Sequence, residues 1–260
     1  EKGFLPSVEI LGKGLGSNDT LPSFVDRPTD DDALLVKGDP SSTIEFEPFT
    51  PAAFHEIAKV TVDAPADGTY YIAVFDENVG GNYGLAVGTR ETFTAEEWLL
   101  IPFVSFRTYQ WEGQTTLSIL APSIIAFFVS FGYAAWTSRR RDVPMDGLWL
   151  MTVISGSLMV ATAASILYQM TWGLSKVGWV NFALVSIMFA VIPLFLGLMI
   201  IRIGLRDSRA RPLTHRTRLA LLLIGAVGLL FWAGWIAGPI LAIISAFFPR
   251  RWMKRDHSDA

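Results

Sequence analysis

Long apolar segments fill most of the chain after residue 114, and they restrict its fold more than any other feature. Four of them are found, at residues 117–136, 148–170, 180–201 and 219–248. None contains Asp, Glu, Lys, Arg or His. Since about 20 such residues suffice for a helix to cross the hydrocarbon core, the sequence predicts a four-helix transmembrane domain over residues 115–249, followed by a basic tail at 250–260.

The fourth segment is longer than one span requires. A helix over residues 219–248 would be about 45 Å long, against a hydrocarbon thickness of about 30 Å. Gly234, Gly238 and Pro239 supply a natural break. We prefer a single span with the tail outside; the alternative is a bent hairpin that returns the tail to the cytoplasmic side.

The charges predict the orientation. Residues 1–95 hold 16 of the 24 acidic residues and 6 of the 21 basic ones, so the excess of Lys and Arg lies in the apolar half. Arginines cluster at 139–141 and 202–218, between the first and second and between the third and fourth apolar segments. By the positive-inside rule these loops are cytoplasmic and residues 1–92 are extracytoplasmic. A removed signal peptide would explain a chain that starts at Glu1.

Residues 1–92 contain short apolar, alternating or β-forming runs separated by turn residues, with clear alternation from residue 43. The predicted strands are residues 43–47, 56–62, 69–75 and 83–87, with shorter pieces at 8–11 and 33–36. This pattern is typical of an antiparallel β-sandwich. The expected fold is therefore an α+β membrane protein with a β-sandwich ectodomain.

Residues 64–88, APADGTYYIAVFDENVGGNYGLAVG, resemble the closing strands of bacterial pre-peptidase C-terminal domains. The resemblance extends over residues 34–88 and implies a small β-sandwich related in shape to carbohydrate-binding modules. Tyr70, Tyr71 and Tyr83 could then stack on a glycan, since aromatic faces suit sugars. As alternating strand residues, they can equally be core or sheet-surface residues.

Residues 93–114 join the two halves. Thr94 and Glu97 form a capping-box pattern at the start of a helix. Trp98, Phe103 and Phe106 follow in an apolar run that is too short to cross a bilayer, and Trp111 lies among polar residues. This pattern is expected of an amphipathic helix at the membrane interface that contacts lipid or a partner. The alternative is a core helix of the soluble domain.

Small residues recur at helical spacing within the spans. Ser157, Ala161 and Ser165 occupy every fourth position, and Gly234 and Gly238 form a GxxxG pair. Both patterns allow close approach of helices, either inside the bundle or against another subunit.

Catalytic and metal-binding patterns are missing from the sequence. It has no Cys, no Walker, GxSxG or HExxH motif, and its histidines, at 55, 215 and 257, fall in separate regions. The acidic run at Asp30–Asp32 lacks the Gly-punctuated pattern of a calcium loop and predicts a solvated turn. Asn18 begins an N-x-T glycosylation pattern. We expect no enzyme activity, cofactor, metal or nucleic-acid partner.

The leading hypothesis is a non-catalytic accessory or scaffold subunit of a membrane complex, whose partners are the lipid bilayer and other membrane-protein subunits. The uncharged spans argue against a pump or an ion-coupled transporter, because ion paths normally need ionisable groups. Two alternatives remain: a channel or transporter for a neutral or hydrophobic solute, and an adhesion protein that binds extracellular glycan.

Overall fold

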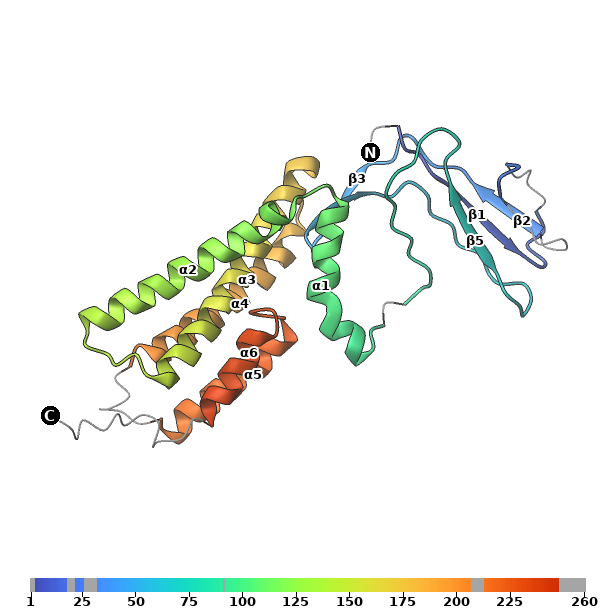
Figure 1. Ribbon diagram of the computed structural model, residues 1–260. Helices are drawn as coiled ribbons and strands as arrows, with labels where there is room; N and C mark the ends of the chain where they lie inside the picture. The colour runs from blue at the N-terminus through green and yellow to red at the C-terminus, as the bar shows by residue number, and fades with distance from the viewer. Residues whose placement is uncertain (1–2, 18–21, 26–31, 91, 207–212, 248–260) are drawn as a thin grey trace. The chain divides into compact units, whose positions relative to one another are not determined.

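The computed structural model describes residues 3–17, 22–25, 32–90, 92–206 and 213–247 (Figure 1). The chain forms two compact units. The β unit comprises Glu1–Glu45 and Phe54–Arg90, and the helical unit comprises Phe46–Ala53 and Glu91–Ala260. The fold is therefore mixed α+β.

A three-stranded antiparallel sheet forms the centre of the β unit. Its strands are β1 (Ser7–Gly12), β2 (Asp32–Val36) and β5 (Tyr71–Phe75), in the order β2-β1-β5. Val8 pairs with Val36 on one side and Val74 on the other. β3 (Ile44–Glu47) and β4 (Ala52–His55) form a separate two-stranded hairpin. The strands expected near residues 8–11, 33–36, 43–47 and 69–75 are thus confirmed.

Two expected strands are wrong: residues 56–62 and 83–87 form no strand. The Ile57 carbonyl accepts a hydrogen bond from the Asp39 N–H at 2.8 Å, but no ladder continues from it. Tyr83, Leu85 and Val87 are all exposed, so alternation there does not separate a buried face from a wet one. The described residues thus contain the three-stranded sheet and the separate β3–β4 hairpin, and the predicted β-sandwich is not shown.

Six helices form most of the described part of the helical unit. They are α1 (Ala95–Trp111), α2 (Thr116–Arg140), α3 (Gly147–Val177), α4 (Ala183–Gly204), α5 (His215–Leu230) and α6 (Ala237–Ala246). The predicted capping box at α1 is confirmed, because Thr94 and Glu97 bond each other's backbone N–H reciprocally. α2, α3 and α4 are long and apolar enough to cross a membrane, close to the predicted first three spans.

Two helices, rather than one continuous helix, form over the described part of residues 219–248, where the sequence predicts the fourth span and a natural break. α5 ends at Leu230, residues 231–236 form a turn, and α6 follows. Gly234 has a positive φ of +70°, and the non-glycine residues Trp232, Trp235 and Ile236 also have positive φ angles, between 46° and 69°. The backbone therefore cannot continue as a right-handed helix. Arg218, near the start of α5, donates to the Ala246 carbonyl at the end of α6. The segment is therefore an antiparallel helical hairpin, as the alternative interpretation required.

α3 lies between α2, α4 and α6 at the centre of the bundle (Figure 1). Its contact with α4 is backbone to backbone: a Cβ on Gly156 would lie 2.5 Å from the Gly197 carbonyl oxygen. α4 buries a small residue every seven positions towards the bundle, at Ala183, Ala190, Gly197 and Gly204. Small residues at this spacing let two apolar helices pack closely without hydrogen bonds between them.

Candidate functional site

A polar stripe runs along α3 in steps of seven residues: Ser155, Thr162, Gln169 and Lys176. Seven residues make about two helical turns, so these side chains share one face and lie about 10 Å apart along the axis. Every member contacts α1, α6, the 231–236 turn or the short segment that follows α1. The stripe therefore organises one side of the helical unit.

The first two residues of the polar stripe, Ser155 and Thr162, bind backbone groups of the α5–α6 hairpin. Ser155 Oγ donates to the Gly238 carbonyl at 2.6 Å, and Thr162 Oγ1 accepts from the Gly234 N–H at 2.8 Å. Both contacts are buried. Because a buried backbone group without a partner is costly, these hydroxyls stabilise the break between α5 and α6.

The last two residues of the stripe, Gln169 and Lys176, form a polar cluster with Glu112 and Gln114, which follow α1. Gln169 Oε1 accepts from Gln114 Nε2 at 2.7 Å, and Lys176 Nζ lies 3.9 Å from Glu112 Oε1. Glu112 also accepts from Gln114 Nε2 at 3.3 Å and from the Ala53 N–H at 2.9 Å. The Glu112 side chain is only 2% exposed, so its carboxylate lies inside the protein. There it joins Ala53, at the tip of the β3–β4 hairpin, to α1 and α3.

The polar cluster has hydrogen-bonding capacity that the described protein atoms do not use. Gln114 Oε1, Gln169 Nε2 and Trp172 Nε1 are buried without a partner among them. Nearby in sequence, burial and then the Glu112 carboxylate raise the pKa of the Tyr109 phenol well above its ordinary value. Tyr109 is therefore neutral at physiological pH.

The other end of α1 contacts the 231–236 turn. Pro102 has no N–H, so it leaves the Trp98 carbonyl without its helical donor. Trp232 Nε1 donates to that carbonyl at 2.8 Å, and the two indole rings lie 5.0 Å apart. Phe103 meets Trp235 edge to face at 6.1 Å. Thus the proline creates an acceptor that the turn uses.

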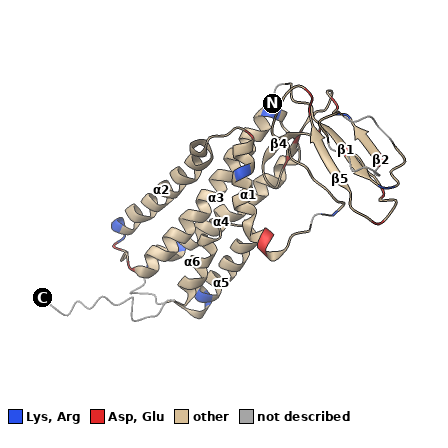
Figure 2. Ribbon diagram, turned by 45° about the vertical axis from the view of Figure 1, so that its right-hand side comes forward, with Lys and Arg blue, Asp and Glu red and all other residues tan. Residues whose placement is uncertain are grey.

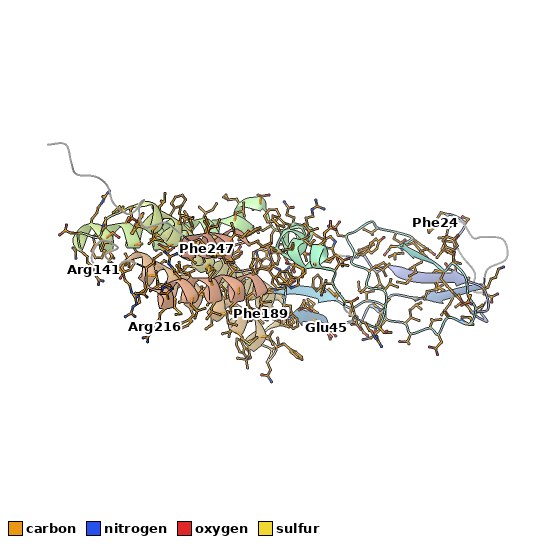
Figure 3. The ribbon with its side chains drawn as sticks, turned by 90° about the horizontal axis from the view of Figure 1, so that it is seen from below. Phe24, Glu45, Arg141, Phe189, Arg216 and Phe247 are labelled. Atoms are coloured by element: carbon orange, nitrogen blue, oxygen red, sulfur yellow. The ribbon has the colours of Figure 1, made fainter. Side chains whose placement is uncertain are left out.

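The tip of the β3–β4 hairpin, residues 46–53, packs on α3 and α4. Phe46 is buried with Met170 and Ala183, and its ring would lie 2.9 Å from a Cβ on Gly173. Ser186 Oγ donates to the Pro48 carbonyl at 2.6 Å. Phe49 contacts Phe189 edge to face, and Figure 3 labels Phe189 on α4. Apolar contacts and one hydrogen bond thereby hold the tip of the β3–β4 hairpin against α3 and α4.

The predicted interface residues have different surroundings. Trp98 and Phe103 contact the turn, Phe106 and Trp111 are half-buried, and only Phe103 is largely exposed. Ser157, Ala161, Gly234 and Gly238 are buried within the helical unit, and Ser165 is half-buried. The small residues therefore serve packing inside the bundle, one of the two roles expected of them.

The predicted glycan-stacking residues are not equivalent. The Tyr70 hydroxyl donates to the Ala66 carbonyl at 2.9 Å, and its ring would meet a Cβ on Gly12 at 2.2 Å, so this residue supports the β unit. Tyr71 and Tyr83 are about half exposed. Asn18 lies outside the described residues, as do Asp30, Asp31 and His257; Asp32 accepts from the Gly16 N–H.

Neither a search for metal-binding groups nor comparison with known proteins assigns a function to this site. Within the described ranges, no group of three His, Asp or Glu side chains could hold a metal ion. Comparisons with protein-family models, curated proteins and solved structures find no match.

Sequence reasoning missed the polar stripe and the cluster around Glu112. A signal existed: Gln169 is the one amide side chain in the second apolar segment, and it lies seven residues from both Thr162 and Lys176. No comparable pattern in the sequence predicts that Trp232 and Trp235 contact α1, because these contacts depend on how the chain turns after α5.

Proposed function

We propose that the protein is an integral membrane subunit without catalytic activity, which presents the acidic β unit outside and docks laterally through its helices. The observation that carries this proposal is the use of polar groups in the helical unit. The buried hydroxyl and amide contacts of the polar stripe join parts of the same chain. They are directed at structure rather than at a reacting group, as in a scaffold.

The exposed surfaces of the long helices support membrane docking. α2 exposes Ile124, Ile125, Phe128 and Val129, and only 17% of the residues in its most apolar stretch are buried. Such a surface suits lipid or another membrane subunit rather than water. Residues 117–136, 148–170 and 180–201 of these helices contain no Asp, Glu, Lys, Arg or His.

Positive charge favours one orientation. Basic residues lie at the end of α2 and the start of α5 (Figure 2), and Figure 3 labels Arg141 and Arg216 at the same end of the helical unit. Arg140 lies over the Trp136 ring at 4.1 Å, an arrangement suited to an interface. We place this end in the cytoplasm and the polar cluster outside.

Purification from the native membrane tests the subunit proposal. The full chain, extracted in mild detergent, should migrate with a stoichiometric partner, and chemical cross-linking before extraction should capture the same partner. A chain that remains alone in both experiments would contradict the proposal.

The 231–236 turn favours a second candidate, a path for a neutral solute. Irregular backbone at membrane depth is tolerated where protein buries it or where it lines a cavity, as in transporters. Flux of uncharged solutes into proteoliposomes that contain only this chain would support the second candidate over the scaffold.

A further inference from the structure

The exposed apolar surface of α2 ends in an arginine. Ile125, Val129 and Trp136 are exposed at spacings of four and seven residues, so they share one face of the helix. Arg140 follows four positions after Trp136 on the same face, and its guanidinium lies over the Trp136 ring at 4.1 Å. Tyr133 is exposed beside them, with its ring centroid 6.1 Å from that of Trp136. Towards the end of α2 this face is therefore apolar, then aromatic, then charged, which is the order at a membrane–water interface.

α4 also ends its exposed apolar surface with an arginine. Val191, Phe195 and Leu198 are exposed at spacings of four and three residues. Arg202 is exposed four positions after Leu198, and these spacings match the helical repeat. The Arg202 guanidinium therefore lies at the end of the apolar surface that α4 turns away from the bundle.

α5 begins with the corresponding arginine. Arg216 is exposed and precedes the exposed Leu219 and Leu223 by three and seven positions, again on one helical face. Each of the three helices thus carries an exposed apolar surface that ends in a guanidinium. The three side chains that share this property, Arg140, Arg202 and Arg216, form an arginine band.

The arginine band lies at one end of the helical unit. Ile201 of α4 is buried with Ala134 of α2, and Ile203 of α4 packs against the cluster that contains Leu213, just before α5. Figure 2 shows basic ribbon at the end of α2 and the start of α5. The band is therefore carried by three neighbouring helix ends rather than by a patch on one helix.

The arginine band has no acidic partner in the part of the chain that the structure describes. None of its three side chains forms an ion pair there. Two carboxylates occur near this end: Asp146 accepts from the Trp149 N–H at 2.8 Å to cap α3, and Asp142 is exposed after α2. Neither forms an ion pair with the band, so its guanidiniums can donate to a group outside the described chain.

The direction in which the arginine band faces favours lipid over a protein partner. A protein bound at the cytoplasmic end would meet the loops that close the bundle, whereas the band continues the lateral surfaces that acyl chains would cover. Because three helices carry the band, one laterally docked helix would not cover it. Tyr133 and Trp136 beside Arg140 are the amphipathic aromatics enriched at the headgroup level. A planar guanidinium matches the phosphate that phospholipids present at this level.

We propose that the arginine band binds anionic phospholipids of the cytoplasmic leaflet, with one headgroup phosphate at each guanidinium. This inference rests on the membrane placement proposed above and extends it to lipid selection. A zwitterionic headgroup carries an ammonium group beside its phosphate, so it attracts a guanidinium less than a net-anionic headgroup does. One basic residue near an anionic leaflet favours binding by about fivefold, which corresponds to about 1 kcal/mol.

Electron spin resonance of lipids labelled on the acyl chain tests the proposal. The full chain is reconstituted alone in phosphatidylcholine vesicles with a trace of labelled phosphatidylglycerol or labelled phosphatidylcholine, and the motionally restricted fraction measures lipid that contacts the protein. The wild-type chain should bind phosphatidylglycerol more strongly than phosphatidylcholine. The triple variant Arg140→Gln, Arg202→Gln and Arg216→Gln should lose this preference, by about fivefold at each former arginine contact. Its restricted phosphatidylcholine should be unchanged, which shows that the variant is still folded and inserted.

A second triple variant controls for net charge. Lys13→Gln, Lys37→Gln and Arg90→Gln remove three exposed positive charges from the β unit, and this variant should keep the wild-type preference. An equal loss of preference in both triple variants would assign the effect to net charge and overturn the proposal.

The remaining outcomes separate the proposal from the membrane placement. If the wild-type chain restricts both lipids equally, the chain is in the membrane but the arginine band selects no anionic lipid, and the proposal is wrong. If the chain restricts neither lipid, the membrane placement fails and the lipid site fails with it.

Photo-cross-linking in native membranes distinguishes lipid from a protein partner. The chain has no cysteine of its own, and Met199 is exposed one helical turn before Arg202. A photoactivatable thiol reagent attached to Met199→Cys leaves the arginine band intact and should yield adducts with anionic phospholipid, detected by mass spectrometry. A single protein adduct in place of lipid would overturn the proposal.

Discussion

α4 and the α5–α6 segment are both strongly apolar and both contain a proline, yet only the second one breaks. α4 continues through Pro193, whereas the chain reverses before Pro239. Proline alone therefore does not decide the outcome. The difference lies in what α3 offers to each segment.

Towards α4, α3 presents small residues, and close contact at Gly156 and Gly197 favours a straight neighbour. Towards the hairpin, α3 presents hydroxyls, and Ser155 and Thr162 satisfy backbone groups that a break leaves without helical partners. One helix thus stabilises a regular span on one face and an interrupted segment on another.

The largest effect should come from filling Gly234. Gly234→Ala places a Cβ 2.9 Å from Gly238 Cα at φ +70°, where L residues are strained. We expect a loss of about 3 kcal/mol, from backbone strain and overpacking together. Thermal unfolding in detergent measures the change.

Gly132→Ala on α2 is the matched control, because its Cβ would meet nothing within 4 Å. Alanine is the better helix former by about 1 kcal/mol, so this variant should be unchanged or slightly more stable. Equal losses of thermal stability in both variants would mean that the 231–236 turn is no more sensitive to an added Cβ than the regular helix α2, against the difference proposed.

Glu112→Ala should lower the free energy of unfolding by about 2 kcal/mol, because buried hydrogen bonds to a charged group in the polar cluster are lost. The Ala53 N–H loses its acceptor, so its hydrogen exchange should accelerate. Glu96→Ala, an exposed carboxylate, is the control and should leave that exchange rate unchanged. Unchanged exchange at Ala53 in the Glu112→Ala variant would show that the hairpin tip is held by its apolar contacts alone.

Thr162→Val tests the polar stripe with little change in volume. It leaves the buried Gly234 N–H without its acceptor, and we expect a loss of about 1.5 kcal/mol. Thr171→Val, whose hydroxyl donates to the Tyr168 carbonyl of its own helix, should cost much less. Thermal midpoints of the two variants compare a bond that stabilises the break with one that does not. A similar loss in both would refute the role assigned to Thr162.

The sequence predicts the uninterrupted helices and most of the strands well. Uncharged apolar length locates α2, α3 and α4, and the Thr94–Glu97 pattern locates the start of α1, because these signals depend on neighbours in sequence. The strands β1, β2, β3 and β5 follow from short apolar, alternating or β-forming runs for the same reason.

The interrupted side depends on contacts between distant residues. Gly234, Gly238 and Pro239 mark a place where the chain can break, but whether it does depends on Ser155 and Thr162, more than 70 positions away. The false strand at 83–87 fails for a related reason, since alternation describes side chains and not the availability of a pairing strand. The position of Glu112 beside Lys176 likewise requires the folded arrangement.

The smallest effect concerns the bond from Trp232 to α1. Trp232→Phe keeps an aromatic ring but removes the indole N–H, and the Trp98 carbonyl loses its donor at a cost of about 1 kcal/mol. Pro102→Ala restores a backbone N–H that can bond the same carbonyl within the helix. In the Pro102→Ala background, Trp232→Phe should therefore cost measurably less, and a double-mutant cycle of thermal unfolding gives the coupling between the two sites. Additive costs would mean that the turn is held to α1 by ring packing, and that the proline does not prepare an acceptor for it.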